Sequence, residues 1–350
     1  MTPDERILVI DIVIPNWNGR ELLTTCLHSL QKQTFRSFRI IIIDNGSHDG
    51  SVAFVREHYP DVHLITLSEN EGFCKAVNKG IQASGNQLVL LLNNDVEVAE
   101  DCLQKLDEAA RKNGDYDFFA LKMIDFHQRT RLDGAGDSVM RGGVGYRLGT
   151  MEQDSAVYSI RRDVFGACGG AALYRRSLFE SIGLFDEDFF AYLEDVDFNL
   201  RAVAAGKKCC YLPDAKIFHM GSASTGSKIN SFTVRLSTRN NIYVVLKNFG
   251  PYLFLRFLPA FLIYQMFWLL FVIKKGQIFS YLHGLVESLK RCGIMMRRYR
   301  ENRRRWRLSR KEFGDVIVNS EKHAIASIMN RRAEQRKSTH LFKVYMKLFC

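Results

Sequence analysis

The amino-acid sequence predicts an α/β fold with a mostly parallel central sheet, followed by an apolar and basic helical region. Two patterns carry this prediction. Short apolar runs alternate with helical patterns over residues 7–92, and a long apolar run precedes a strongly basic tail. The chain has 350 residues, of which 47% are hydrophobic and 25% are charged. This length and composition allow a large core, so we expect one large domain with an appendage.

The alternating pattern predicts four strands and three helices before residue 93. The apolar runs are rich in Ile, Val and Leu, which is typical of parallel strands that are covered on both faces. The expected strands are 7–14, 38–43, 62–67 and 87–92, and the expected helices are 20–33, 51–59 and 75–83.

Two later segments also have informative patterns. Residues 133–149 are rich in glycine and are expected to form a mobile loop or hairpin. Their glycines do not link a strand to a helix, so we expect no dinucleotide-binding fingerprint there. A helix is expected at 194–205, ended by Gly206 and followed by a short strand that leads to His219.

The last third of the chain combines an apolar run with positive charge. Residues 252–273 are long enough to cross a bilayer, although they include Arg256, Pro259 and Gln265. Residues 241–350 contain 22 Lys and Arg against 6 Asp and Glu, whereas residues 1–240 contain 27 against 32. An apolar segment beside such charge favours an anionic membrane surface as the partner. Nucleic acid is not expected, because no recognition module is present. We expect either one membrane span or a hairpin in the interface.

The cysteines and the first residues favour a cytosolic compartment. The eight cysteines show no CxxC or metal-type spacing, which fits reduced thiols. The first apolar run is preceded by acids and interrupted by Asp11, so we expect no export signal.

Polar, turn-forming residues follow each of the expected strands. Ligands of such sheets bind beyond the carboxyl ends of the strands, which makes these residues candidates for a site. Asp44 has two interpretations: its carboxylate accepts from the imide N–H of a uracil or thymine ring, or it caps the next helix. Asn18 is likewise either a ligand contact or a helix cap. The four polar segments are 15–19, 44–47, 68–72 and 93–95.

Several segments, in this order, resemble the inverting family 2 glycosyltransferases. The segments IDIVIPNWNGRELL, FRIIIIDNGSHDGS, NEGFCKAVNKGI and LVLLLNNDVE match the start of that family, and GACGGAALYRRSLFESIGLFDEDFFAYLEDVDFNLRAVAAG matches its acceptor-side half. The chain is similar to bacterial rhamnosyltransferase-like enzymes that build lipopolysaccharide or cell-wall glycans. The resemblance implies the Rossmann-like GT-A fold. It divides the chain into a nucleotide-sugar half at 1–100, an acceptor half at 101–245, and a membrane-associated helical tail at 246–350.

The resemblance also implies roles for residues in the first half. The nucleoside side of the site would comprise Pro15, Asn18, Asp44, Asn70, Gly72 and Asn78. The sequence Asn93-Asn94-Asp95 matches the DxD-type element, whose last carboxylate holds a divalent cation, Mg²⁺ or Mn²⁺, on the donor diphosphate. Asn93 replaces the first acid of that element, and one protein carboxylate holds a cation less firmly than two.

Further roles fall in the second half. His219 would be a second metal ligand, with an ordinary core or surface histidine as the alternative. Arg239 would neutralise the leaving diphosphate, with a surface salt bridge as the alternative. Glu194 and Asp195 open the 194–205 helix, and Asp195 matches the general base of the family. Asp197 is interpreted instead as a structural partner of Arg201, four residues later.

These roles imply an inverting transfer in which Asp195 removes the proton of the acceptor hydroxyl. The expected donor is dTDP-L-rhamnose and the expected acceptor is a lipid-linked saccharide at the cytoplasmic face of a bacterial inner membrane. The alternatives are a UDP-hexose or UDP-N-acetylhexosamine donor, or a non-catalytic membrane-bound protein that binds sugar nucleotides.

Overall fold

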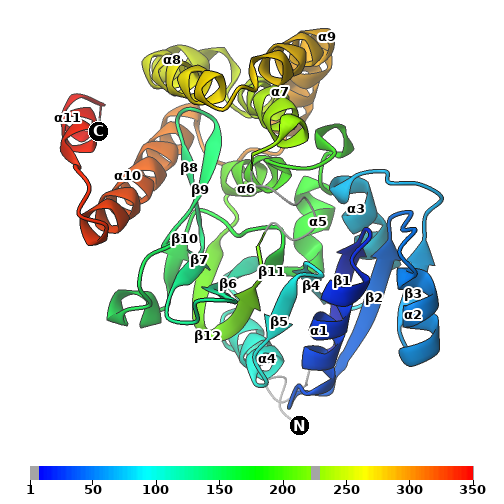
Figure 1. Cartoon of the computed structure of the whole chain (residues 1–350). Coiled ribbons are helices and arrows are strands. Elements are labelled where there is room, and N and C mark those ends of the chain that lie inside the picture. Colours follow the sequence, from blue (N-terminus) through cyan, green and yellow to red (C-terminus); the bar gives the residue numbers. More distant parts are fainter. Residues whose placement is uncertain (1–7, 222–228, 350) are drawn as a thin grey trace.

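The centre of the molecule is a ten-stranded mixed sheet, with eight strands in the order β10-β12-β6-β11-β4-β1-β2-β3 (Figure 1). The structure is a computed structural model and describes residues 8–221 and 229–349. Strand β5 pairs with β12, and β7 pairs with β6. The strands of this sheet are β1 (Ile10–Asn16), β2 (Phe38–Asp44), β3 (His63–Thr66), β4 (Leu88–Leu92), β5 (Val96–Val98), β6 (Phe118–Asp125), β7 (Leu132–Ala135), β10 (Arg162–Val164), β11 (Ala171–Arg175) and β12 (Cys209–His219).

Most of the central strands run in the same direction. Strands β3, β2, β1 and β4 pair in parallel, and so do β6 and β12. Strand β11 is antiparallel to both β4 and β6, so it joins two parallel groups of the same direction. The expected mostly parallel α/β sheet is confirmed, and the strand before His219 is longer than expected at eleven residues.

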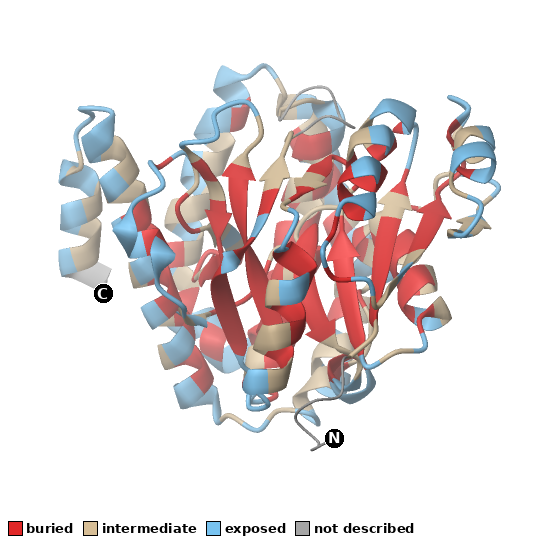
Figure 2. Ribbon diagram, turned by 90° about the horizontal axis from the view of Figure 1, so that it is seen from below, coloured by how far each residue is buried: buried red, intermediate tan, exposed pale blue. Residues whose placement is uncertain are grey.

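Helices cover both faces of the sheet and bury its apolar side chains (Figure 2). Successive residues of β1 point to opposite faces, so that Ile12 joins one core cluster and Val13 the other. One face is covered by α1 (Arg20–Gln31), α2 (Ser51–His58) and α4 (Cys102–Lys112), and the other by α3 (Phe73–Ala83), α5 (Arg176–Ile182) and α6 (Glu194–Ala204).

Five helices follow the sheet, and several of them complete its core. Met295, Phe313 and Ile317 are fully buried in the same apolar cluster as α3, α5 and α6. Removing these helices would therefore expose the core of the preceding domain. They are α7 (Ser231–Asn248), α8 (Gly250–Lys274), α9 (Ile278–Arg303), α10 (Arg310–Glu334) and α11 (His340–Phe349).

Part of the basic tail is used inside the molecule. Arg298 contacts Asp186 and lies 2.7 Å from a carboxylate oxygen of Asp188. Arg291 Nη1 lies 2.6 Å from Asp188 Oδ1, and Arg305 donates to the carbonyl of Ile182 at 2.8 Å. These three arginines are therefore engaged with the loop before α6.

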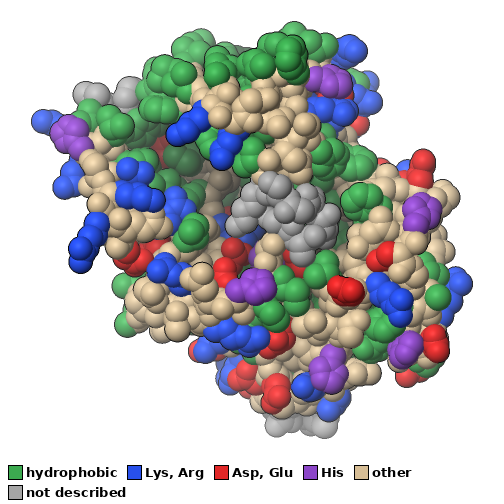
Figure 3. Space-filling model, viewed as in Figure 1, with side chains coloured by type: hydrophobic (Ala, Val, Ile, Leu, Met, Phe, Trp, Pro, Cys, Tyr) green, Lys and Arg blue, Asp and Glu red, His purple; other side chains and the backbone are tan. Residues whose placement is uncertain are grey.

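Helix α8 contains the expected apolar segment as one continuous helix. Among the described residues it is the helix that is long and apolar enough to cross a membrane. Its side chains Leu255 and Leu262 are 69% and 56% exposed, and Phe279 of α9 is 83% exposed. Figure 3 shows hydrophobic side chains gathered on the end of the molecule where Figure 1 places α8 and α9. This exposed apolar surface lies outside the core of the domain.

Candidate active site

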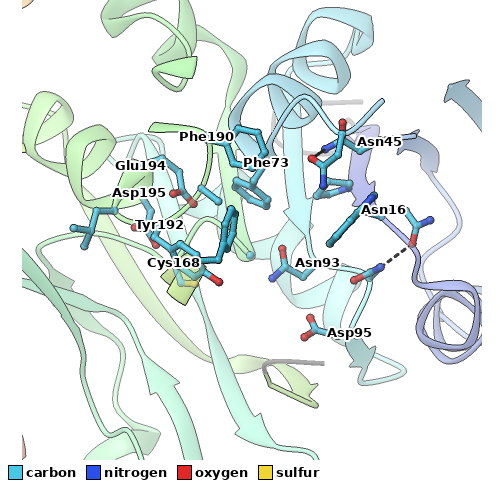
Figure 4. Close-up of a pocket in the computed structure, with 18 of the residues that line it drawn as sticks. Asn16, Asn45, Phe73, Asn93, Asp95, Cys168, Phe190, Tyr192, Glu194 and Asp195 are labelled. Atoms are coloured by element: carbon cyan, nitrogen blue, oxygen red, sulfur yellow. Dashed lines mark hydrogen bonds between the residues drawn. The ribbon is translucent and has the colours of Figure 1, made fainter. Parts of the chain in front are cut away.

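A cavity of about 830 Å³ lies beyond the carboxyl ends of β1, β2 and β4 (Figure 4). On one side it is lined by residues that follow these strands, including Pro15, Asn45 and Asp95. On the other side Figure 4 shows Glu194 and Asp195, which begin α6. Residues that are separated by a hundred positions in the sequence therefore face one space.

The wall on the strand side is held by a row of amides. Asn94 Nδ2 donates to Asn16 Oδ1 at 2.7 Å, and Asn16 Nδ2 donates to Asp44 Oδ1 at 3.0 Å. Asp44 Oδ2 accepts from the backbone N–H of Ser47 at 2.9 Å, and Asp44 is only 2% exposed. Asp44 therefore lies behind the cavity lining, where it orients Asn16. Sequence reasoning missed Asn16, which has the same strand-end position as its neighbours.

Asn18 joins two of the strand-end loops. Its φ is +47°, and its Oδ1 accepts from the backbone N–H of His48 at 2.8 Å. Its own N–H donates to Ser47 Oγ at 2.9 Å. Asn18 is outside the cavity lining, whereas its neighbours Pro15 and Trp17 are part of it.

The segment before α3 contributes the lining residue Asn70 and the supporting residue Gly72, and α3 itself contributes the supporting residue Asn78. Asn70 lines the cavity, and its Oδ1 accepts from Asn45 Nδ2 and from the N–H of Gly72, both at 3.0 Å. Gly72 has φ +91°, and a Cβ at this position would lie 2.7 Å from the ring of Phe190. Asn78 is buried and donates to the carbonyl of Phe185 at 2.9 Å, outside the lining.

Asp95 and His219 meet because β5 pairs with β12. This pairing places His219 opposite Val96, the residue after Asp95. The His219 Nε2 to Asp95 Oδ1 distance is 3.4 Å, which is an ion-pair distance, and among the described residues no hydrogen-bond donor satisfies Asp95 Oδ1. His219 Nδ1 lies 2.8 Å from Asp133 Oδ2. Burial lowers the pKa of His219, but Asp133 and Asp95 outweigh this and raise it to about 9.

These groups fit a divalent cation in part. Asp95 is 5% exposed and has one carboxylate oxygen without a hydrogen bond, which is the state expected of a metal ligand awaiting a cation. The described residues contain no group of three or more His, Cys, Asp or Glu side chains arranged to hold a metal ion. A cation at Asp95 and His219 would therefore need donor phosphate oxygens or water to complete its coordination. Asn93 packs closely against Gly170. A Cβ added at Gly170 would lie 2.6 Å from the amide nitrogen of Asn93.

A strained segment presents the two acids of α6. Phe190, Tyr192 and Leu193 all have positive φ, at 63°, 69° and 65°. Such angles cost energy in residues other than glycine and persist only where the surroundings impose them. Glu194 and Asp195 follow directly, in the first turn of α6, where the helix dipole favours negative charge.

Asn240 and Arg239 hold this segment in place. Asn240 Nδ2 donates to the carbonyls of Phe189, Ala191 and Tyr192 at 2.9, 2.8 and 2.7 Å. Arg239 Nη2 donates to the carbonyls of Asp188 and Phe189 at 3.1 and 2.8 Å. Arg239 does not line the cavity, so in this structure its guanidinium supports the loop that carries the acids.

The environment of Asp195 suits a base. Its Oδ1 accepts from the N–H of Val196 at 2.8 Å, and its Oδ2 faces the N–H of Gly169 at 3.4 Å. Burial raises the pKa of Asp195, and the nearby Arg147 opposes that rise. Burial together with negative Asp195 raises the pKa of Glu194 to about 8, and Glu194 Oε2 has no hydrogen-bond partner among the described residues. A raised pKa brings a carboxylate closer to the range in which it accepts protons efficiently.

The glycine-rich segment forms a hairpin that sequence reasoning did not connect with the site. Strands β8 (Asp137–Met140) and β9 (Val144–Arg147) pair with each other. Arg147 lines the cavity, contacts Asp133 and donates to Cys168 Sγ at 3.1 Å. The sequence does show charged residues at both ends of the glycine-rich stretch. No local pattern, however, indicates which element these residues face.

Asp197 is a structural partner of Arg201, as their spacing in the sequence predicted. It is fully buried, and its Oδ2 lies 2.9 Å from Arg201 Nε and 2.7 Å from Lys247 Nζ. Its Oδ1 accepts from Asn248 Nδ2 at 2.9 Å. Both oxygens are therefore engaged away from the cavity.

Comparisons with known proteins concern the family of the chain. Residues 11–183 match the family model described as "Glycosyl transferase family 2". A relative from Mycobacterium tuberculosis, "N-acetylglucosaminyl-diphospho-decaprenol L-rhamnosyltransferase", is 28% identical over 243 residues, covering 62% of this chain and 78% of the relative. A "PGL/p-HBAD biosynthesis glycosyltransferase" from Mycobacterium bovis is 28% identical over 196 residues, covering 55% of this chain and 69% of the relative.

Solved structures share the GT-A fold with this chain. The structure of GalNAc-T7 with UDP, GalNAc and Mn²⁺ aligns with a TM-score of 0.58 and 18% identity, covering 71% of this chain and 49% of that structure. The structure of S. aureus TarS residues 1–349 with UDP aligns with a TM-score of 0.52 and 15% identity. The alignment covers 90% of this chain and 92% of that structure.

Proposed function

We infer that this chain is a family 2 glycosyltransferase, a member of a family that transfers sugars with inversion. From that premise we propose that it moves L-rhamnose from dTDP-L-rhamnose to a saccharide linked to a polyprenyl diphosphate. The transferred sugar and the acceptor are suggested by the relative from Mycobacterium tuberculosis, whose name describes rhamnosyl transfer to N-acetylglucosaminyl-diphospho-decaprenol.

The observation that carries the proposal is the pairing of two acidic centres across one cavity. Asp95 with His219 lies at the strand ends, and Glu194 with Asp195 lies at the start of α6. An inverting displacement needs a base on the acceptor side and charge stabilisation on the side of the leaving group. Glu194 with Asp195 lies on the side that needs the base, and Asp95 with His219 lies on the side that needs the charge stabilisation.

Asp195 is the proposed general base. As the acceptor oxygen attacks the anomeric carbon, its proton passes to the Asp195 carboxylate, and the bond to the nucleoside diphosphate breaks on the opposite side. No covalent enzyme intermediate is needed. Burial and the negative charge of Asp195 raise the pKa of Glu194, which favours the protonated form that is able to donate a hydrogen bond.

Asp95 and His219 are the proposed ligands of a divalent cation, Mg²⁺ or Mn²⁺, and cation binding would displace the proton of His219, which ligates as the neutral imidazole. Such a cation neutralises charge that develops on the leaving diphosphate. The orphaned oxygen of Asp95 supports this assignment, and Asn93 and Asn94 line the same part of the cavity. We expect chelation by EDTA to reduce transfer by at least about 100-fold, with recovery when Mg²⁺ or Mn²⁺ is added.

In this proposal the nucleoside lies along Pro15, Asn16, Asn45 and Asn70. The other residues assigned to the nucleoside side contribute by fixing the loops of this wall. Those supporting residues are Asn18, Asp44, Gly72 and Asn78.

The proposal is tested by a screen of nucleotide sugars against a lipid-linked acceptor. We expect Asp195→Asn to lower kcat by about 10² to 10⁴-fold, the range of a general base, and Asp95→Ala to lower it by about 10²-fold. The matched control is Asp214→Asn, because Asp214 is an exposed position of β12 outside the cavity. Full turnover by Asp195→Asn would refute the assignment of the base, and selective use of a UDP-sugar would replace the proposed donor.

We also propose that α8 and α9 hold the enzyme against an anionic membrane on its cytoplasmic face. The exposed apolar side chains of these helices are flanked by exposed cations, which add roughly 1 kcal/mol each near anionic lipid. The test is flotation with vesicles that contain anionic lipid. We expect the combined variant Arg297→Glu, Arg300→Glu and Arg304→Glu to float less than wild type, whereas Lys32→Glu with Arg36→Glu floats normally. Equal flotation of both variants would contradict the proposal.

A further inference from the structure

A second cavity of about 570 Å³ lies between the β8–β9 hairpin, α8, α10 and α11. We propose that this cavity binds part of the isoprenoid chain of the lipid-linked acceptor. The inference rests on the proposed function, because it assumes an acceptor in which a sugar diphosphate is attached to such a chain. The volume falls within the range of about 300–1,000 Å³ that is usual for small-molecule pockets.

The lining of the second cavity suits a hydrocarbon chain. Most of the lining side chains are aliphatic or aromatic, including Val144 of β9, Ile263 and Phe267 of α8, and Phe342 of α11. Glu321 is 1% exposed and is neutralised by the buried Arg141, and it also accepts from the hydroxyl of Tyr345 at 3.1 Å. The buried charge in this wall is therefore paired, and no uncompensated charge of Glu321 opposes an apolar ligand.

The β8–β9 hairpin connects the second cavity to the catalytic cavity. Val144 lines the second cavity and Arg147 lines the catalytic one. Three residues of extended chain span about 10 Å, so the two cavities adjoin opposite ends of one short strand. A Cβ at Gly145 would lie 2.7 Å from Val196, the residue after the proposed base. A ligand whose chain lies in one cavity would thus bring its head group close to the other.

Three arginines lie along the β8–β9 hairpin between the second cavity and the catalytic cavity. Arg332 lines the second cavity, Arg331 lies with its guanidinium 5.8 Å from the ring centre of Tyr146, and Arg147 lines the catalytic cavity. Arginine is well suited to binding phosphate groups, because its fixed fork of donors matches their oxygens. Positive charge between an apolar cavity and a sugar-transfer site complements a molecule built as chain, diphosphate and sugar, in that order.

The opening of the second cavity continues the apolar surface of α8. Phe267 is 55% exposed and Leu341 is 72% exposed, and both belong to the lining. An isoprenoid chain that lies on the exposed apolar surface of α8 and α9 would therefore reach the second cavity over apolar side chains.

The first test compares acceptors that differ only in chain length. The probes are the same N-acetylglucosamine diphosphate carrying either a farnesyl or a butyl group. We expect Ile263→Trp, which narrows the second cavity, to raise the KM for the farnesyl acceptor by about tenfold, because burial of roughly two methylene groups is lost. The KM for the butyl acceptor should stay within about twofold of wild type. The matched control is Ile160→Trp, because this isoleucine is 64% exposed, outside both cavities and away from α8 and α9.

A second measurement does not depend on folding of a variant or on turnover. The wild-type full-length protein is photolabelled with a benzophenone derivative of farnesyl diphosphate, and the labelled peptides are identified. We expect label on α8, β9 and α11, with protection by farnesyl diphosphate but not by a phospholipid of equal chain length.

The outcomes separate the two proposals. Equal effects of Ile263→Trp and Ile160→Trp, or label confined to other elements, or protection by phospholipid alone, would overturn the isoprenoid cavity while leaving the transferase intact. Label in this cavity without transfer to either acceptor would instead refute the proposed acceptor and retain the binding site.

Discussion

The strand-end wall of the catalytic cavity and the loop at residues 186–197 differ in where their supporting contacts come from. In the strand-end wall, Asn16, Asp44 and Asn94 bond to one another, and each directly ends or follows a strand of the parallel group. In the 186–197 loop, Asn240 of α7 and Arg298 of α9 supply the contacts. The contacts of the strand-end wall follow from the geometry of the sheet. Those of the 186–197 loop come from α7 and α9, which lie later in the sequence.

This difference explains the place of the strained residues. Phe190, Tyr192 and Leu193 have positive φ in a loop whose carbonyls accept hydrogen bonds from Asn240 of α7 and from the Cys74 N–H of α3. The strand-end wall has one such residue, Asn18, whose hydrogen bonds come from the adjacent strand-end loop rather than from remote helices. Changes to remote helices should therefore affect the acids more than the nucleotide side.

The largest expected effect comes from removing the clamp on the strained loop. Asn240→Leu removes a donor from three loop carbonyls, of which Phe189 keeps Arg239, at a cost of about 2 kcal/mol in the free energy of unfolding. We expect kcat to fall by about 10²-fold, with a much smaller change in donor affinity. Steady-state kinetics and calorimetric donor titration measure the two quantities. Asn330→Leu, at an exposed position of α10, should leave both unchanged; equal losses of kcat and donor affinity would contradict the division into two walls.

A smaller loss of stability is expected from Arg298→Met. Burial raises the pKa of Asp186, but Lys247 and Arg298 outweigh this and hold it at about 2. This pKa lies below the ordinary value near 4, so the stabilisation is present above about pH 4 and is lost as the pH falls toward 2. We expect Arg298→Met to lose about 2 kcal/mol at pH 7, since Lys247 still pairs with the carboxylate.

Urea unfolding at pH 7 and at pH 3 measures this effect, which should be smaller at the lower pH. The control is Arg297→Met, because Arg297 is 71% exposed and lies 3.9 Å from Glu301. A pH-independent difference between the two variants would show that Arg298 acts by packing rather than by charge.

A shift in the pH profile is expected from Arg147→Gln. Arg147 lowers the pKa of Asp195, so its removal raises that pKa and moves the acidic limb of kcat/KM to higher pH. Below the limb the proposed base is protonated, and activity should rise with pH until it is deprotonated. Arg129→Gln, which breaks an exposed pair with Glu97, should leave the limb in place. A limb that moves to lower pH would be inconsistent with this electrostatic role.

The smallest effect is expected in the strand-end wall. Asn70→Ala removes the acceptor of two hydrogen bonds on a partly exposed turn, at a cost of about 1 kcal/mol. We expect donor KM to rise about fivefold with kcat unchanged. Glu69→Ala, on the exposed neighbouring residue, is the control. A larger loss of kcat than in Asn240→Leu would reverse the comparison between the two walls.

Sequence reasoning located the alternating elements well because their signals are local. The expected strand 38–43 and helix 51–59 differ from β2 and α2 by one residue at the carboxyl end. Likewise, polar residues after buried strands pointed to Asp95, because a parallel sheet brings such residues to one edge. The side that each residue faces was less predictable, as Asp44 shows by lying behind Asn16.

The acidic loop and the hairpin were harder to interpret for a physical reason. Arg147 reaches the cavity because β9 packs beside α6, and Asn240 reaches the loop because α7 packs against it. Neither contact leaves a periodic trace in the sequence. The basic tail carried the same ambiguity, since charge alone does not distinguish Arg298, which is bound inside the molecule, from Arg297, which is exposed.

By itself the sequence determined the α/β order of elements, the strand ends that carry Asn93 to Asp95, and the acids at the start of α6. These features depend on hydrophobic periodicity and on residues a few positions apart. Only the tertiary structure decided that His219 meets Asp95, that Arg239 supports a loop, and that α8, α10 and α11 enclose a second cavity. Those arrangements depend on pairings between distant segments, which are fixed by packing of the whole chain rather than by local preference.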